Sequence, residues 1–406
     1  MTTGDMQGIY LDHHATTPTD ERVVTAMRPI FTQDFGNPAS DANHRIGQQA
    51  QEHVKNAREQ IRDALNAQRT KEIIFTSGAT ESDNLAIKST MEYAKNTGLG
   101  THVVTVATEH EAVLEPCEHI SEDGFEVTVL PVDEHGLVDL DEIRDSIREE
   151  TALVSIMAAN NEVGTVAPIM EIGSITDEYD VLFHTDAVQA VGYREFDVQT
   201  QNIDLMSISG HKIYGPTGVG ALYVDYDLDI PEMEPLLHGG GQERGLRSGT
   251  LNVPGIVGLG KAISLAEQNR DERSTRIEKL RNRLWTQLSE QLDDLYLNGH
   301  PERRLPNNLN VSFLGVDNRR LLGRLNNDGV YAASGSACST TGADENSSTG
   351  KTHEVRESHV LEAMFEDTDR IRSAIRFGLG KDTSEHDIDQ AAEIIVSNVN
   401  RLRQFN

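Results

Sequence analysis

Strands and helices alternate along residues 72–187, and this alternation constrains the fold more than any other feature of the sequence. Short runs rich in β-branched and apolar residues lie at 72–77, 102–108, 126–132, 151–159 and 181–187. Segments with helical patterning follow the first three runs. A helix between two strands returns the chain so that the strands pair in parallel. The sequence therefore predicts an α/β fold with a mostly parallel sheet and helices on both of its faces.

The pattern changes in the last third of the chain. Apolar residues recur there at helical spacing, at Ile277, Leu280, Leu284, Leu288 and Leu292. A strand pattern follows at 307–314, and Ser384 can cap a final helix. We expect a large domain over residues 15–260 and a smaller α/β domain formed by residues 1–14 and 261–406.

A lysine lies at the end of a predicted strand in the stretch 204–224. Residues 205–209 read as a strand, Lys212 follows in a polar turn, and a Gly/Pro-rich loop leads to a second strand at 220–224. Ligands of open α/β sheets bind at the ends of the strands. Lys212 is therefore a candidate for an amine held near a cofactor, although most loop lysines are simply solvated.

A glycine turn between a predicted strand and helix provides a candidate anion site. Residues 77–80 read Ser-Gly-Ala-Thr, so free backbone N–H groups and the Thr80 hydroxyl would lie at a helix N-terminus, with Ala79 between them. Capping of the helix by Thr80 is the alternative. Ser209 and His211, beside the candidate lysine, could supply further contacts to a phosphate.

Two other strand ends carry polar side chains. Asp186 ends the run at 181–187, and Gln189 follows three residues later. His110 begins the element after another strand and could stack on a planar ligand or carry a proton. A capping role for Asp186 and a structural role for His110 are the alternatives.

These groups together match the needs of pyridoxal phosphate. That cofactor requires a lysine for a Schiff base, an acid opposite the pyridine nitrogen, a flat group over the ring and a cradle for the phosphate. The sequence offers a candidate for each at successive strand ends. The adjacent histidines His13 and His14 do not predict a metal site, because neighbouring strand residues point to opposite faces.

The charge of the chain limits its partners. The net charge is −30, from 36 basic and 66 acidic residues. This argues against direct nucleic-acid binding and against an anionic membrane surface, and it is typical of proteins kept soluble in high salt. We see no signal peptide and no apolar run of membrane-spanning length. The two cysteines, Cys117 and Cys338, favour a reducing cytoplasm over a disulfide framework.

Seven segments resemble motifs of the cysteine desulfurases, particularly the branch that serves iron–sulfur assembly and nitrogen fixation. They are TSGATESDNLAIK (76–88), TEHEAV (108–113), NNEVGTVAPI (160–169), HTDAVQAVG (184–192), SISGHKIYGPTGVGALYV (207–224), HGGGQERGLRSGT (238–250) and SGSACST (334–340). The resemblance covers nearly the whole chain. It implies a fold-type I pyridoxal-phosphate enzyme, with a mostly parallel seven-stranded sheet in the large domain, and a homodimer.

The resemblance also implies roles for individual residues. Lys212 is similar to the Schiff-base lysine and Asp186 to the partner of the pyridinium nitrogen, with Gln189 and Asn161 near the ring hydroxyl and His110 stacked on the ring. The phosphate-binding positions correspond to Ala79, Thr80, Ser209, His211 and, from the partner subunit, Thr250.

The substrate and sulfur positions follow in the same way. Arg376 is similar to the arginine that binds the substrate carboxylate, a task that suits its planar fork, with Asn37 and Asn161 assisting. Cys338 is similar to the nucleophile, whose thiolate takes the sulfur of L-cysteine as a persulfide and leaves alanine. Lys212 and His110 would move protons. Cys117 lies in a helical stretch without a motif and suits a buried structural residue.

The chain departs from the iron–sulfur-assembly enzymes after Cys338. The polar, glycine-bearing stretch 340–357 makes this part of the chain longer than in those enzymes. It is expected to be a mobile loop that could carry sulfur to an acceptor. The acceptor is expected to be a protein, and the pathway could be iron–sulfur cluster assembly, DNA phosphorothioation or tRNA thiolation. The alternatives are another enzyme of the same fold, such as an aminotransferase or a lyase that releases free sulfide or selenide, and a non-catalytic scaffold.

Overall fold

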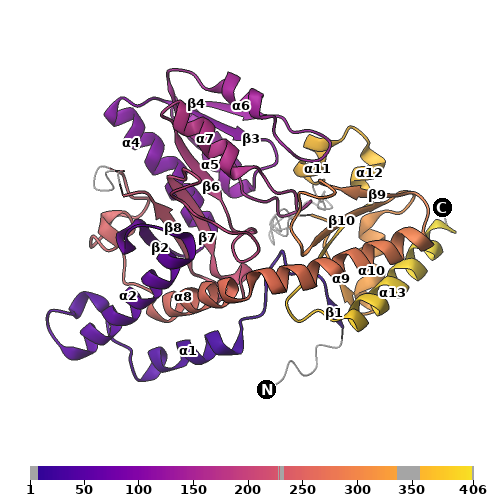
Figure 1. Ribbon diagram of the computed structural model, residues 1–406, viewed down its shortest axis with the longest axis horizontal. Coiled ribbons are helices and arrows are strands. Elements are labelled where there is room, and N and C mark those ends of the chain that lie inside the picture. The colour runs from indigo at the N-terminus through magenta and orange to yellow at the C-terminus, as the bar shows by residue number, and fades with distance from the viewer. Residues whose placement is uncertain (1–7, 227, 229–232, 336–356, 405–406) are drawn as a thin grey trace, which may run out of the picture.

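The computed structural model describes residues 8–226, 228, 233–335 and 357–404. Its main element is a seven-stranded sheet (Figure 1). The strands, in spatial order, are β2 (Ile73–Thr76), β8 (Gly220–Val224), β7 (Leu205–Ser209), β6 (Leu182–Asp186), β5 (Thr151–Ser155), β3 (His102–Val106) and β4 (Glu126–Leu130). β8 runs antiparallel to both of its neighbours, β2 and β7, and the other neighbouring strands of this sheet pair in parallel. The predicted mostly parallel sheet is confirmed.

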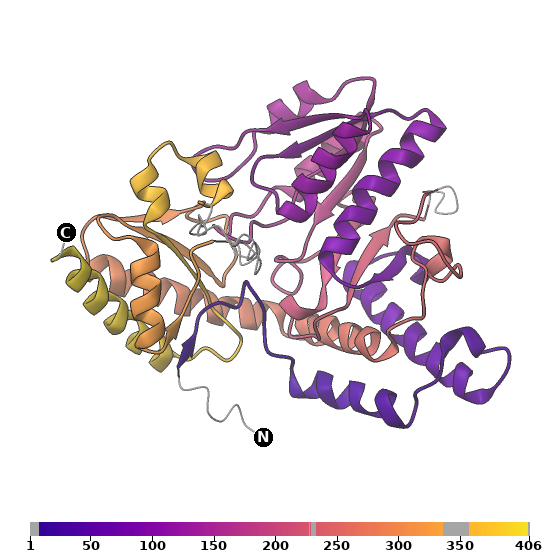
Figure 2. The same ribbon diagram turned by 180° about the vertical axis from the view of Figure 1, so that it is seen from behind.

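Helices cover both faces of this sheet. One face packs under α3 (Ala79–Asn84), a π-helical turn (Leu85–Ser89), α4 (Thr90–Thr97) and α5 (Glu111–Glu122), which Figure 2 shows from behind. The elements on the other side include α1 (Glu21–Thr32), α2 (Arg45–Leu65), α7 (Ile169–Glu178) and α8 (Val253–Gln268), and α6 (Leu140–Ser146) contacts both β4 and α7. Neighbouring strand residues alternate between the faces: Ile73 is buried in one apolar cluster and Ile74 in the other.

The remaining strands form two smaller sheets. β9 (Leu295–Asn298), β10 (Asn308–Phe313) and β12 (Ala374–Gly378) are antiparallel, with β10 in the centre. β1 (Ile9–Tyr10) pairs in parallel with β11 (Val330–Tyr331). The helices of this half are α9 (Arg270–Gln291), α10 (Asn318–Asn327), α11 (His359–Met364), α12 (Thr368–Arg372) and α13 (Glu385–Arg403). The exact division into domains stays a prediction.

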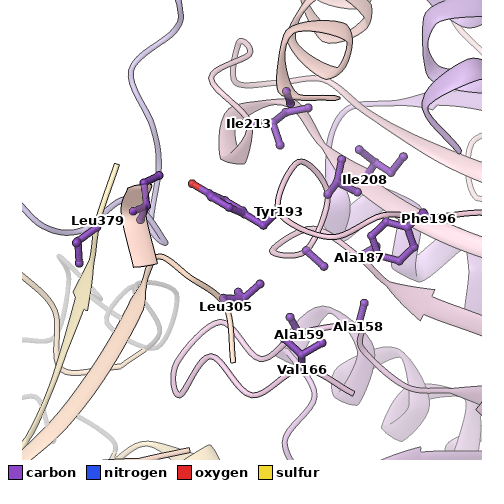
Figure 3. Close-up of a cluster of buried hydrophobic side chains, with 14 of the residues drawn as sticks. Ala158, Ala159, Val166, Ala187, Tyr193, Phe196, Ile208, Ile213, Leu305 and Leu379 are labelled. Atoms are coloured by element: carbon purple, nitrogen blue, oxygen red, sulfur yellow. The ribbon is translucent and has the colours of Figure 1, made fainter. Parts of the chain in front are cut away.

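Two long helices connect the halves. α8 packs against α1 and α2, α9 packs against α13, and the two run end to end along one side of the molecule (Figure 1). The apolar core continues across the junction: Leu305 and Leu379 belong to the same buried cluster as Tyr193 and Ala187, and Figure 3 shows Tyr193 extending toward Leu379. Among the described residues, no helix combines the length and apolar character needed to span a bilayer.

Candidate active site

A cavity of about 490 Å³ lies where the carboxyl ends of β6 and β7 face α3 and β12. The sequence proposed thirteen site residues, and ten of them line this cavity: Ala79, Thr80, His110, Asn161, Asp186, Gln189, Ser209, His211, Lys212 and Arg376. They come from positions almost 300 residues apart in the chain, so the fold alone brings them together. The carboxyl ends of the strands place the cavity where open α/β sheets bind ligands.

Lys212 ends the short 3-10 helix Gly210–Lys212 that follows β7. Its Nζ donates hydrogen bonds to the backbone oxygens of His14 (2.5 Å) and Ala15 (2.7 Å). The Thr17 hydroxyl donates to the His211 oxygen at 2.8 Å, which ties the N-terminal segment to the same turn. The lysine amine is therefore held at the cavity wall by two carbonyl groups.

Asp186 is the last residue of β6 and is only 8% exposed. Its Oδ1 accepts a hydrogen bond from the Val188 backbone N–H at 2.9 Å. Burial raises the pKa of Asp186 above its ordinary value, while this hydrogen bond, His110 and Lys212 act in the opposite direction. A positively charged group bound beside Asp186 would also lower its pKa and so stabilise the ionised carboxylate.

The glycine turn before α3 has the backbone that the sequence predicted for an anion site. Gly78 caps α3 with φ of +154°, a conformation that favours glycine, and a Cβ there would meet only open space. Gly220 of β8 lies directly against it, because a Cβ on Gly220 would come within 2.8 Å of the Gly78 backbone. The two glycines therefore allow the turn to lie against the sheet. Ala79 and Thr80, the first two residues of α3, line the cavity, and the N–H groups at the start of a helix have no partner within that helix.

His211 lies across the same cavity and is neutral. Burial, followed by the nearby Lys212 charge, lowers its pKa to about 4. Its Nδ1 is 3.1 Å from the Thr16 hydroxyl. A neutral ring can give one N–H hydrogen bond to an anion without adding a charge.

His110 is the N-cap of α5, and this position fixes its ring. Its Nδ1 accepts a hydrogen bond from the Ala112 backbone N–H at 3.0 Å. A neutral His110 therefore carries its proton on Nε2. The sequence left a structural role and a role in stacking or proton transfer as alternatives for His110, and the ring both caps the helix and lines the cavity.

Gln189 and His14 hold each other in the cavity wall. The Gln189 Oε1 lies 2.8 Å from His14 Nδ1, and the Gln189 Nε2 donates to the His14 backbone oxygen at 3.1 Å. Burial lowers the pKa of His14 to about 3, so the ring is neutral and its Nδ1 is the donor to Gln189. This pair of side chains holds the N-terminal segment in place, and the backbone oxygens of the same segment accept the hydrogen bonds of Lys212.

Arg376 of β12 is 1% exposed yet lines the cavity. Its Nη2 bonds Asp12 Oδ1 at 2.9 Å, and its Nη1 donates to the Asn161 backbone oxygen at 3.0 Å. Among the described residues, its Nε–H has no hydrogen-bond partner. A buried guanidinium with an unused donor is suited to binding a carboxylate that enters the cavity.

Three proposed residues are not placed in this cavity. Asn37 is exposed and its Oδ1 accepts a hydrogen bond from the Ala39 N–H at 3.0 Å, at the start of a 3-10 turn. Thr250 is exposed, and its predicted role belongs to a partner subunit. Cys338, with nearly all of the stretch 340–357, lies outside the described residues. The described chain before it reaches the site, because Ala333 exchanges backbone hydrogen bonds with Arg376.

Sequence reasoning missed four polar residues around the cavity. Asp12 and His14 were not proposed as site residues: the two adjacent histidines were considered only as metal ligands, and their strand-and-turn pattern gives no reason to place this segment beside residues 189 and 376. Asp83 and Glu109 lie inside recognised motifs, but both are completely buried. A buried carboxyl group contradicts the usual partition of charged residues to the surface, and only the fold reveals it.

The residues present fit pyridoxal phosphate. The cavity joins a lysine amine, a buried carboxylate, an imidazole ring and a helix N-terminus with a glycine turn, and it holds a buried arginine donor for a substrate carboxylate. Each of these corresponds to one part of the cofactor or of an amino acid bound to it.

Comparisons with known proteins agree with this chemistry. Residues 9–391 match the class-V aminotransferase family. The chain is 46% identical to cysteine desulfurase IscS of Methanosarcina thermophila over 98% of this chain and 94% of the relative. It is similar in structure to a NifS-like protein (TM-score 0.86, 36% identity, 97% and 100% of the two chains covered). It is also similar to DndA from Streptomyces lividans (TM-score 0.74, 35% identity, 90% and 97% covered).

Proposed function

The chain belongs to the class-V aminotransferase family, and we propose that the cavity is the site where it acts as a cysteine desulfurase. The enzyme depends on pyridoxal 5'-phosphate and converts L-cysteine to L-alanine, with transfer of the sulfur to a protein cysteine persulfide. The observation that carries the assignment of the site is the convergence of Lys212, Asp186 and Arg376 on one cavity.

Lys212 and Asp186 are the residues proposed to hold the reactive part of the cofactor. When bound, pyridoxal phosphate accepts the electron pair left when the substrate Cα–H bond breaks. Asp186 would hold a proton on the ring nitrogen, because an ionised carboxylate in a buried place favours a cation beside it. Lys212 would bind the cofactor through Nζ and then, once free as an amine, move the Cα proton.

Arg376 is proposed to orient the substrate. Its contacts with Asp12 and the Asn161 oxygen fix the guanidinium plane, so the N–H groups that these contacts leave over bind the L-cysteine carboxylate in one orientation. Asn161 would contact the substrate from the adjacent wall.

His110 is proposed to cover the cofactor ring and to carry protons. Its Nδ1 is occupied by the helix cap, so only Nε2 is available for exchange. An imidazole is suited to this task because its ordinary pKa lies near neutral pH.

Cys338 is proposed to be the nucleophile. Its thiolate attacks the substrate sulfur, the S–S bond forms as the Cβ–S bond breaks, and Cβ takes up a proton, so that one cysteine and one thiol give alanine and one persulfide. Support comes from the motif around Cys338 and from the chain on either side of it. Gly335 and Ser358 both lie against the Glu162 side chain, next to Asn161 of the cavity wall.

We propose that the sulfur passes to an acceptor protein that serves iron–sulfur cluster assembly, DNA phosphorothioation or tRNA thiolation. We also propose that the protein is a homodimer located in the cytoplasm. Support for the dimer comes from the resemblance and from the exposed side chains of Phe31, Phe35 and Ile46, three large apolar groups within sixteen residues.

Replacement of the lysine tests the site. The Lys212→Ala variant should lack the visible absorbance of the lysine-bound cofactor and should form no detectable alanine from L-cysteine. Lys261→Ala, on α8 outside the cavity, is the control and should retain both. A normal cofactor spectrum in Lys212→Ala would show that the cofactor is bound elsewhere.

A further inference from the structure

Three buried carboxyl groups lie together at the cofactor site, and the proposed function uses only one of them. Asp186 and Asp83 line the same cavity, from β6 and from α3. Asp83 and Glu109 are both completely buried. Both lie close enough to Asp186 for its negative charge to raise their pKa values. Carboxylates grouped in this way cannot all be ionised.

In the part of the chain that the structure describes, no cation balances a negative charge on Asp83. Neither of its carboxyl oxygens makes a hydrogen bond of ordinary geometry, although the Ser207 hydroxyl acts to lower its pKa. Within the same described set, the basic atom paired with it is His184 Nε2, at 3.7 Å. His184 is itself completely buried, and burial lowers its pKa to about 3, so the ring is neutral. An unpaired buried carboxylate is strongly disfavoured and takes up a proton instead.

The other groups around Asp83 either raise its pKa further or do not balance a negative charge on it. Glu109 accepts a hydrogen bond from the Met157 N–H at 2.6 Å through Oε1, whereas its Oε2 has no partner among the described residues. Burial, then Asp186 and Glu109, raise the pKa of Asp83 well above its ordinary value, and the Ser207 hydroxyl opposes this only in part. Lys212 and His110 lower the pKa of Asp186, and neither is among the groups that shift the pKa of Asp83.

We propose that Asp83 is a positioning residue that stays in the neutral acid form, so that it places no second negative charge beside Asp186. A second charge beside Asp186 would make Asp186 take up a proton and lose its hold on the ring nitrogen. The inference rests on the proposed role of Asp186. It assigns a function to the same short helix, α3, whose first residues line the phosphate side of the cavity.

The test compares the Asp83→Asn, Asp186→Asn and parent holoenzymes. Asparagine matches a neutral aspartic acid in shape and cannot ionise. In infrared spectra at about pH 8, Asp83→Asn should lack the carbonyl band of one protonated carboxyl group that the parent shows. This pH is chosen because Asp204, whose pKa burial raises to about 7, is then mostly ionised and does not contribute to the band. The pH midpoint of the visible cofactor band should move by less than about 0.3 units in Asp83→Asn and by at least about one unit, a tenfold change, in Asp186→Asn.

Two results would each overturn the inference. An unchanged protonated-carboxyl region in Asp83→Asn would mean that Asp83 is ionised in the parent. A midpoint shift as large as that of Asp186→Asn would mean that Asp83 contributes a charge to the cofactor. If the asparagine variant does not fold, Asp83→Ser, which is smaller and equally unable to ionise, gives the same two readouts.

A further variant, Asp204→Asn, is the control for loss of a carboxyl group away from the cofactor. Asp204→Asn removes a half-buried carboxyl group just before the opposite end of β7 and should leave the cofactor midpoint unchanged. If Asp186→Asn leaves the midpoint unchanged as well, the proposed role of Asp186 fails. The infrared result for Asp83 still stands in that case, because it reports the proton on Asp83 alone.

Discussion

Single residues of the site differ in how far the sequence could predict them. Lys212 and Asp186 follow clear strand patterns, so their position at strand ends can be read from local sequence. Arg376 came only from the resemblance, since a strand pattern gives no reason to bury an arginine at 1% exposure. Its burial depends on Asp12 and on the Asn161 oxygen, which are 364 and 215 residues away. Pairings across such separations exist only in the fold.

The geometry of Arg376 predicts a specific effect on substrate binding. Arg376→Lys keeps the charge but loses the planar fork, so its contacts with Asp12, Asn161 and the substrate cannot all form. We expect KM for L-cysteine to rise by roughly tenfold to a hundredfold, the cost of one or two charge-assisted hydrogen bonds, with a smaller change in kcat. Steady-state kinetics of alanine formation measure both constants.

A matched control separates this effect from a general effect of the substitution. Arg319 is exposed on α10, and Arg319→Lys should leave both kinetic constants unchanged. An Arg376→Lys variant with the parent KM would show that the substrate carboxylate binds elsewhere.

At the scale of elements, the strands were predicted better than the helices. Residues 205–209 and 220–224 are strands exactly as predicted, whereas the other predicted strands extend past the observed ends by up to four residues. α8 was missed because its glycines weaken the helical pattern. The reason for those glycines is packing: a Cβ on Gly260 would lie 2.7 Å from the Ala57 Cα on α2. β9 was missed because it has four residues and is only partly buried.

The turn between β2 and α3 gives a prediction at this scale. Gly78→Ala would place a side chain at φ of +154°, a backbone conformation that costs about 1–3 kcal/mol for other residues. The turn should relax and displace the N–H groups at the start of α3. We expect the cofactor dissociation constant to rise by roughly tenfold or more, measured by titration of the absorbance.

Gly124→Ala is the control for strain alone. Gly124 also has a positive φ, of +91°, and open space around it, but it lies after α5 and outside the cavity. This variant should lose stability without losing cofactor affinity. Equal cofactor affinities for the Gly78 and Gly124 variants would contradict the role of the turn.

At the scale of the whole molecule, the charge of −30 remains the property that the fold explains least. Repulsion among surface carboxylates destabilises a compact state, and salt screens it. We expect the melting temperature of the holoenzyme to rise by at least several degrees between about 0.1 M and 2 M KCl, since the Debye length falls from about 10 Å to below 3 Å. Thermal unfolding followed by circular dichroism measures this.

Sucrose at matched osmolality provides the comparison, because it stabilises compact states without screening charge. An equal rise in sucrose, or no rise in KCl, would contradict a stability limited by charge repulsion.

The central claim is that sulfur moves from L-cysteine to one cysteine of this chain. Mass spectrometry after a brief exposure to L-cysteine, with alanine measured in parallel, tests it most directly. Cys117 is the internal control, because it is buried and burial raises the pKa of its thiol to about 12. We predict one added sulfur on the Cys338 peptide, none on the Cys117 peptide, and an equal amount of alanine. Alanine formed without sulfur on Cys338 would contradict the account and would identify a lyase that releases sulfide.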